Sequence, residues 1–146
     1  MADTGLRGKT AIVGIGQSGL GEAPGRSSME LLAEASLHAV NDAGLKLSDV
    51  DGLFAGTMNH FMPALTTAEY LGIRPRYSGS TMIGGSSFVA HIVTAMMAVV
   101  TKQCDVALIA YGSNQRTAAG RLVSGSNAEY MAYEAPYKPR NPISAY

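Results

Sequence analysis

The chain has 146 residues, 47% of them hydrophobic, which is enough for one globular domain with a packed core. Its 11 basic and 11 acidic side chains give a formal net charge of zero and are scattered, so they favour no nucleic acid or anionic partner. The single cysteine, Cys104, excludes an internal disulfide. With no apolar export signal at the start and no apolar run of the ~20 residues that span a bilayer, we expect a cytoplasmic protein without membrane insertion.

The first expected elements are a strand, a loop and a helix. Residues 10–16 (TAIVGIG) form a short apolar run closed by glycines, which predicts a strand buried on both faces. Residues 17–26 contain three glycines and a proline and predict a loop. Ser27 and Glu30 have the spacing of a capping box, and Gly44 stands where a left-handed helix end is expected. We therefore predict a helix between Ser27 and Gly44.

Two more strands and two more helices are expected further along the chain. Residues 53–56 (LFAG) predict a short strand, residues 64–71 a short helix, and residues 77–82 an extended segment. Residues 86–103 lack glycine and proline and are apolar almost all round, which predicts a central, buried helix. Residues 105–111 (DVALIAY) predict another buried strand.

The alternation of strands and helices predicts an α/β fold with a mostly parallel sheet covered on both faces. We assign residues 1–112 to this domain. Residues 113–146 have no apolar run but contain four tyrosines and three prolines, which predicts the start of an irregular loop layer.

One glycine motif follows the first expected strand. Gly14, Gly16 and Gly19 match the dinucleotide-binding pattern GxGxxG. That pattern requires a helix to begin at its last glycine, so that the helix N-terminus faces the pyrophosphate, but here the helix is expected only after Ser27. We therefore expect no bound dinucleotide cofactor.

The segment before the long buried helix is the strongest candidate site. Gly84, Gly85, Ser86 and Ser87 lie between an extended segment and that helix, where backbone N–H groups and the positive end of the helix dipole can face a ligand. The alternative is structural, since serine is a common helix cap. The residues alone leave both interpretations open.

The remaining reactive side chains favour structural roles. His38, His60 and His91 have no spacing that gathers them on one metal, so no metal site is expected. His91 lies within the buried helix and is interpreted as a hydrogen-bonded core residue in preference to a catalytic base. Cys104 follows the C-terminus of that helix, where the dipole disfavours a thiolate, and is interpreted as structural.

The order of these segments and their amino-acid sequences resemble those of the thiolase superfamily, in particular the lipid-transfer or SCP-x-type acetyl-CoA acetyltransferases. The likeness covers nearly the whole chain and rests on three stretches: AIVGIGQSGLGEAPGRSSMELLAEA, DAGLKLSDVDGL and GGSSFVAHIVTAMMAVVTKQCDVALIAYGS. The resemblance implies a layered thiolase fold with two similar halves, a substrate site between them, and a homodimer in which residues 77–83 lie at the interface. It also implies that this chain corresponds to the N-terminal half and cannot complete an active site by itself.

In the family, a nucleophilic cysteine stands at the N-terminus of the long buried helix. Counting back from Asp105 places that position on Gly85, whereas counting back from Gly112 places it on Ser86, and neither is cysteine. Cys104 cannot replace it, because it lies at the other end of the helix, about 28 Å away at 1.5 Å per residue. The resemblance thus implies an acyl-CoA site without its usual nucleophile.

Three functions are compatible with this resemblance. Members without the cysteine include aldolases that act on carbon–carbon bonds next to an acyl-CoA thioester in lipid, steroid or aromatic acid metabolism, often with a zinc-ribbon/OB-fold partner. In that case Gly85 supplies a backbone oxyanion donor beside Ser86, and Gly84 and Ser87 bind substrate. The alternatives are an active acetyl-CoA acetyltransferase that uses another nucleophile, such as Ser86, and a non-catalytic acyl-CoA- or lipid-binding or assembly subunit. Acyl-CoA is the expected substrate, and no bound cofactor is expected.

Overall fold

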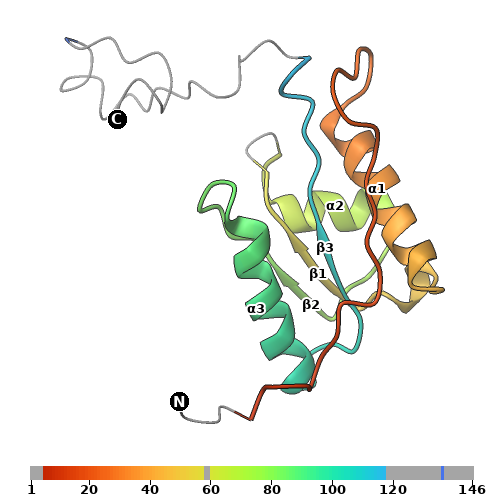
Figure 1. The fold of residues 1–146 in the computed structure, drawn as a ribbon, viewed down its shortest axis with the longest axis vertical. Coiled ribbons are helices and arrows are strands. Elements are labelled where there is room, and N and C mark those ends of the chain that lie inside the picture. The colour runs from red at the N-terminus through yellow and green to blue at the C-terminus, as the bar shows by residue number, and fades with distance from the viewer. Residues whose placement is uncertain (1–4, 58–59, 118–135, 137–146) are drawn as a thin grey trace.

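The computed structural model describes residues 5–57, 60–117 and residue 136 (Figure 1). Three strands within these residues form an all-parallel sheet in the order β2-β1-β3, with Gly52 in register with Tyr77 and Ala107. The α/β fold with a parallel sheet is therefore confirmed. The elements in chain order are α1 (Ser28–Asp42), a 3-10 turn (Leu47–Asp49), β1 (Gly52–Ala55), α2 (Pro63–Leu71), β2 (Tyr77–Gly79), α3 (Ser87–Val100) and β3 (Ala107–Ala110).

The helices cover the sheet on both faces (Figure 1). Helix α3 packs on β1 and β3 from one side, and α1 and α2 pack on the other side. Each interface has its own apolar cluster: Leu32, Leu53 and Leu108 belong to the cluster on the α1–α2 side, and Phe54 and Ala95 to the cluster on the α3 side. The central strand β1 is buried along its whole length.

Local sequence signals explain where α1 and α2 begin and end. Ser27 caps α1 in a capping box with Glu30, as predicted, and Gly44 has a φ of +68° just beyond the helix. Pro63 occupies the first turn of α2, and Gly72 ends it with a φ of +68°.

The predicted strand at residues 10–16 is wrong. This segment belongs to no strand, and Ile12, Val13 and Ile15 are 71%, 64% and 77% exposed. It runs beside α1 so closely that a Cβ on Gly14 would lie 2.3 Å from the carbonyl oxygen of Ala39. A groove of about 1190 Å³, which the segment lines together with β3 and α3, separates it from the sheet. Held against α1, the segment pairs with no strand of the part of the chain that the structure describes.

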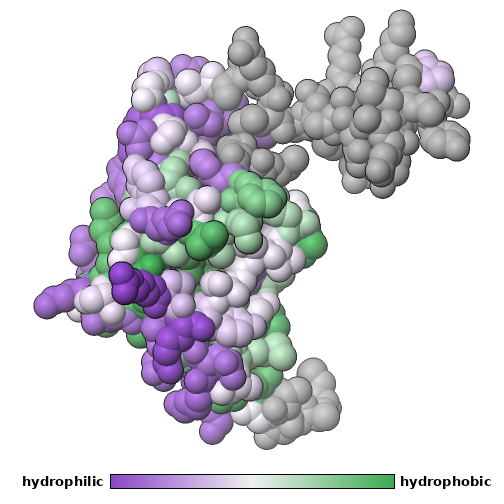
Figure 2. Space-filling view, turned by 180° about the vertical axis from the view of Figure 1, so that it is seen from behind, coloured by the Kyte–Doolittle hydropathy of each residue, from purple (hydrophilic) through white to green (hydrophobic). Residues whose placement is uncertain are grey.

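The prediction of a fully buried α3 is correct for one face only. Ser87, His91, Ala95 and Ala98 are buried against the sheet, whereas Val89, Val93 and Met97 are more than half exposed. Among the described residues, only the sheet packs against this helix closely, so its outer face has no cover. Figure 2 shows that hydrophobic residues also reach the surface on the rear of the molecule, in patches between hydrophilic ones.

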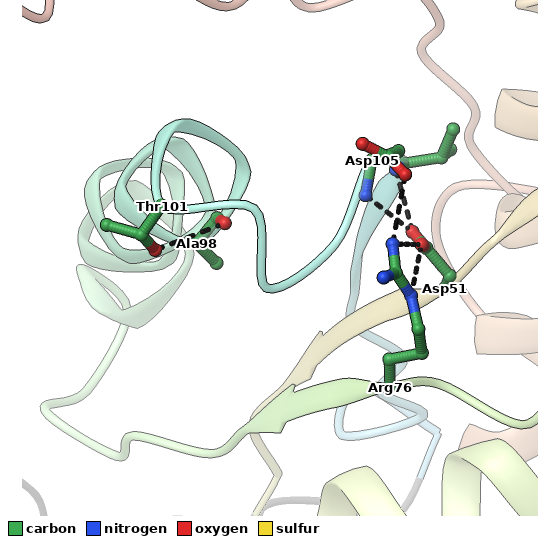
Figure 3. Close-up of polar contacts among 6 residues, drawn as sticks. Asp51, Arg76, Ala98, Thr101 and Asp105 are labelled. Atoms are coloured by element: carbon green, nitrogen blue, oxygen red, sulfur yellow. Dashed lines mark hydrogen bonds and ion pairs between the residues drawn. The ribbon is translucent and has the colours of Figure 1, made fainter.

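A carboxylate joins the three strands where they begin (Figure 3). Asp51, just before β1, accepts hydrogen bonds from the backbone N–H groups of Asp105 and Val106, at 2.9 and 2.8 Å, just before β3. It also accepts from the guanidinium of Arg76, just before β2, which forms a second ion pair with Asp105. This cluster fixes the end of the sheet opposite the candidate site.

Candidate functional site

The candidate site lies where the parallel strands end. Residues 80–86, here called the glycine loop, lead from the end of β2 to the start of α3. In parallel α/β sheets, ligands bind outside the carboxyl ends of the strands, where the loops carry variable side chains and helix N-termini point at the ligand. The site predicted from the sequence therefore has the position that this architecture favours.

The first part of the glycine loop is held by neighbouring elements. Ser80 accepts a hydrogen bond from the backbone N–H of Ala64 in α2 at 3.1 Å, and the N–H of Thr81 donates to Nε2 of His91 in α3 at 3.2 Å. Gly56, directly after β1, allows the loop to pass closely, because a Cβ there would lie 3.0 Å from the sulfur of Met82.

His91 is a buried, hydrogen-bonded residue, which confirms the interpretation drawn from the sequence. Its side chain is 1% exposed and lies against the ring of Phe54, with ring centroids 5.9 Å apart. Burial lowers the pKa of the imidazole, and Nε2 must be unprotonated to accept the Thr81 N–H. His91 is therefore neutral, with its proton on Nδ1, an atom that has no partner among the described residues.

The two adjacent serines at the start of α3 differ in their surroundings. Ser87 is fully buried; its hydroxyl donates to the carbonyl of Gly84 at 2.7 Å and accepts from the N–H of Ile83 at 3.0 Å. Ser86 is exposed and its side chain makes no cap hydrogen bond. The hydroxyl of Ser87 is thus occupied within the protein, whereas that of Ser86 faces solvent, and direct contact of Ser87 with a substrate stays a prediction.

The two glycines also have different roles. Gly84 has a φ of +78°, a left-handed conformation in which a side chain would be strained. Gly85 has no positive φ, and a Cβ built on it would meet nothing within 4 Å. Of the two, Gly85 is the position where a side chain fits without strain, and the space around it is open.

Cys104 is far from this loop. It lies beyond the C-terminal end of α3, a helix of 14 residues and therefore about 21 Å long. Its side chain is fully buried and its sulfur would be 2.6 Å from a Cβ on Gly52, so the thiol fills the core. Burial raises the pKa of this thiol, which confirms a structural role in preference to a nucleophilic one.

The other histidines do not join the site. His60 contacts the Ser28 hydroxyl at 3.1 Å, and His38 contacts the carbonyl of Gln17 at 2.8 Å. Within residues 5–57 and 60–117, no three His, Cys, Asp or Glu side chains come together in a way that could hold a metal ion. In the same part of the chain, no helix is long and apolar enough to cross a membrane.

Two curated relatives match most of this chain. A 17-hydroxy-3-oxo-4-pregnene-20-carboxyl-CoA lyase of Mycobacterium tuberculosis is 39% identical over 113 residues, which are 77% of this chain and 29% of that protein. A steroid side-chain-cleaving aldolase of Thermomonospora curvata is 32% identical over 146 residues, covering 94% of this chain and 37% of that protein. The chain thus spans about a third of the length of these relatives. No protein-family profile matches it.

Solved structures agree with these relatives. The Ltp2-ChsH2(DUF35) aldolase superposes with a TM-score of 0.76 and 30% identity, covering 92% of this chain and 35% of that one. A monomeric SCP2-thiolase like protein type 1 of Mycobacterium smegmatis superposes with a TM-score of 0.55 and 26% identity, covering 67% of this chain and 22% of that one. This chain has the thiolase fold. Its homologues and structural neighbours are thiolase-like proteins and aldolases, which agrees with the resemblance noted in the sequence.

Proposed function

We propose that this chain is the N-terminal part of a thiolase-fold aldolase, of the lipid-transfer branch, that cleaves or forms a carbon–carbon bond next to an acyl-CoA thioester. The observation that carries the proposal is the open space around Gly85 at the N-terminus of α3. We propose that Gly85 occupies the position at which a thiolase uses a cysteine. The names of the two curated relatives, a lyase of a steroid carboxyl-CoA and a steroid side-chain-cleaving aldolase, support a steroid-derived acyl-CoA as substrate.

The chemistry of a retro-aldol cleavage fits a site that has N–H donors but no nucleophile. A base outside the described residues removes the proton of a 3-hydroxyl group, the new carbonyl forms, and the bond between C2 and C3 breaks. Its electron pair moves to the thioester as an enolate, and C2 is then protonated to give a shortened acyl-CoA and a free ketone. We propose that the N–H of Gly85, beside Ser86, binds the enolate oxygen, an interaction worth roughly 3 kcal/mol per donor in comparable oxyanion holes. Gly84 lets the substrate approach the backbone closely.

The test is a turnover assay on the native gene product. A 3-hydroxyacyl-CoA with a tertiary hydroxyl should be converted into a ketone and a shortened acyl-CoA, both detected by mass spectrometry, and iodoacetamide should not affect the rate. Thiolysis of 3-ketoacyl-CoA should be absent, since burial withholds Cys104 from substrate. Robust thiolysis that is lost when Cys104 is alkylated would refute the proposal. An acyl group trapped on Ser86 would establish an acyltransferase instead, and acyl-CoA binding without any turnover would establish a binding or assembly subunit.

We propose that the whole protein is a homodimer that also binds a zinc-ribbon/OB-fold subunit. Strand β2 is an edge strand in the described sheet, and the residues after it, Met82 and Ile83, are 45% and 59% exposed, so residues 77–83 offer backbone and apolar surface to a second copy. The name of the Ltp2-ChsH2(DUF35) aldolase supports a second subunit. Analytical ultracentrifugation should show a dimer at micromolar concentration, and a stable monomer would contradict this assignment.

A further inference from the structure

We propose that Ser87 and His91 are positioning residues, which hold the glycine loop in the one conformation that presents its backbone N–H groups to a thioester. This inference rests on the proposed function and assigns the residues that prepare its site. Ser87 and His91 stand one turn apart on the buried face of α3, so they point in the same direction. Each makes a hydrogen bond to the backbone of the glycine loop.

The glycine loop has little else to fix it. Residues 80–86 are all exposed, and Met82 and Ile83 do not belong to either apolar cluster. A loop whose apolar side chains lie outside the apolar clusters depends largely on hydrogen bonds for its conformation. In this loop, Ser80 is hydrogen-bonded to α2. Thr81 is hydrogen-bonded to the side chain of His91, and Ile83 and Gly84 are hydrogen-bonded to that of Ser87.

The bonds of Ser87 set the geometry at Gly84. The Gly84 carbonyl accepts from both the hydroxyl and the backbone N–H of Ser87, at 2.7 and 3.1 Å, while the same hydroxyl accepts from the N–H of Ile83. This double attachment holds Gly84 in its left-handed conformation, with a φ of +78°. The orientation of the peptide groups at Gly85 and Ser86 follows directly from that turn.

His91 fixes the other side of the loop because its neutral ring presents an acceptor to Thr81. The ring lies against both Phe54 and Phe88, with centroids 5.9 Å away in each case. A clamped acceptor of this kind restricts the Thr81 peptide, whereas a side chain without an acceptor would leave that N–H unpaired. Ser87 and His91 therefore influence the bound substrate through the conformation of the glycine loop, without having to contact the substrate themselves.

The test compares Ser87→Ala and His91→Phe in the native gene product with a matched control. Ser36→Ala removes a similarly buried hydroxyl on α1, which donates to the carbonyl of Leu32 in the same helix. We expect each loop variant to lower kcat for aldol cleavage by about tenfold, equal to about 1.4 kcal/mol of transition-state stabilisation, with KM changed less than about twofold. The Ser36→Ala control should keep the wild-type kcat. His91→Gln, which retains an amide acceptor, should have a kcat between those of His91→Phe and the wild type.

A second readout requires no turnover. Hydrogen exchange measured by mass spectrometry should be faster in the peptide with Thr81 and Ile83 in both loop variants than in the wild type or in Ser36→Ala, while peptides from β1 keep their protection. Faster exchange together with an inactive wild type would support the positioning role and refute the aldolase proposal. Unchanged exchange in this peptide, or a loss of kcat equal to that of Ser36→Ala, would overturn the inference. If Ser87→Ala or His91→Phe fails to fold, Ser87→Thr and His91→Gln take their place in the test. Because these variants keep a hydroxyl and an acceptor, their loop peptide should exchange at the wild-type rate, and faster exchange in both would contradict the inference.

Discussion

The Gly85→Cys substitution should create a reactive thiol where the protein now has none. Its side chain would enter open space, because nothing lies within 4 Å of a Cβ at this position, and the backbone there needs no left-handed conformation. The N-terminus of α3 lowers the pKa of a thiol, whereas burial raises the pKa of Cys104. Cys104 is also fully buried, so iodoacetamide reaches it only when the core opens. We therefore expect iodoacetamide to label Gly85→Cys at least about tenfold faster than Cys104, and acyl-CoA to acylate it.

Two neighbouring substitutions are the controls for this prediction. Gly84→Cys places a side chain on a residue with a φ of +78°, so it should destabilise the loop and abolish aldol cleavage without gaining acylation. Ser86→Cys tests the second alignment of the family's nucleophile: if it alone accepts an acyl group, Ser86 and not Gly85 occupies that position. A Gly85→Cys variant that is labelled no faster than Cys104 would show that the N-terminus of α3 does not activate a thiol, and one that acyl-CoA does not acylate would contradict an acyl-CoA site here.

Elements with a complete local signal could be predicted from the sequence. The capping box of Ser27 with Glu30 and the left-handed Gly44 mark the two ends of α1, and the structure contains both. The LFAG run matches β1 within one residue, α2 begins one residue before its predicted range, and β3 lies inside the predicted residues 105–111. In each case the residues that decide the structure are close together in the sequence, so no distant contact has to be known.

The segment at residues 10–16 could not be predicted in the same way, because a strand needs a neighbour. Its composition is typical of a buried strand, but its position is decided by contact with α1, whose backbone approaches Gly14 and Gly16 too closely for any Cβ. Gly14 and Gly16 carry a signal for this contact, although they also fit the dinucleotide-binding pattern. Glycines spaced two apart also suit close packing against a helix.

The candidate site was located from the sequence, but the roles inside it were not. Paired glycines and serines before an apolar helix indicated a ligand-binding turn, yet nothing distinguishes Ser86 from Ser87 until the helix face is known. Burial makes Ser87 a partner of the loop backbone and leaves Ser86 in solvent. The contact between His91 and Thr81 was also invisible, since His91 lies one helical turn beyond the recognisable motif.

Asp51→Ala should cause the largest loss of stability among single substitutions outside the two apolar clusters. Asp51 is the acceptor that joins the beginnings of all three strands, and its side chain is 22% exposed (Figure 3). Removing it leaves the N–H groups of Asp105 and Val106 without their acceptor and frees Arg76. At about 1–3 kcal/mol for each unsatisfied backbone group, with little added by the exposed ion pair, we expect a loss of about 3 kcal/mol in the free energy of unfolding. Urea unfolding measures it.

Asp51→Asn and Arg76→Ala separate the contributions of the carboxylate. The amide of Asp51→Asn keeps an oxygen for the N–H groups of Asp105 and Val106, so this change should cost about 1 kcal/mol, and Arg76→Ala no more than that. Burial acts to raise the pKa of Asp51, but hydrogen bonds from Val106, Arg76 and Asp105 outweigh it and hold the pKa below its usual value. The stability from this ionised group is present above the unfolded pKa of about 3.9 and is lost as the pH falls further. The wild type should therefore lose more stability than Asp51→Asn below about pH 4, and parallel acid-unfolding curves would show that backbone acceptance, and not charge, is what Asp51 contributes to the sheet.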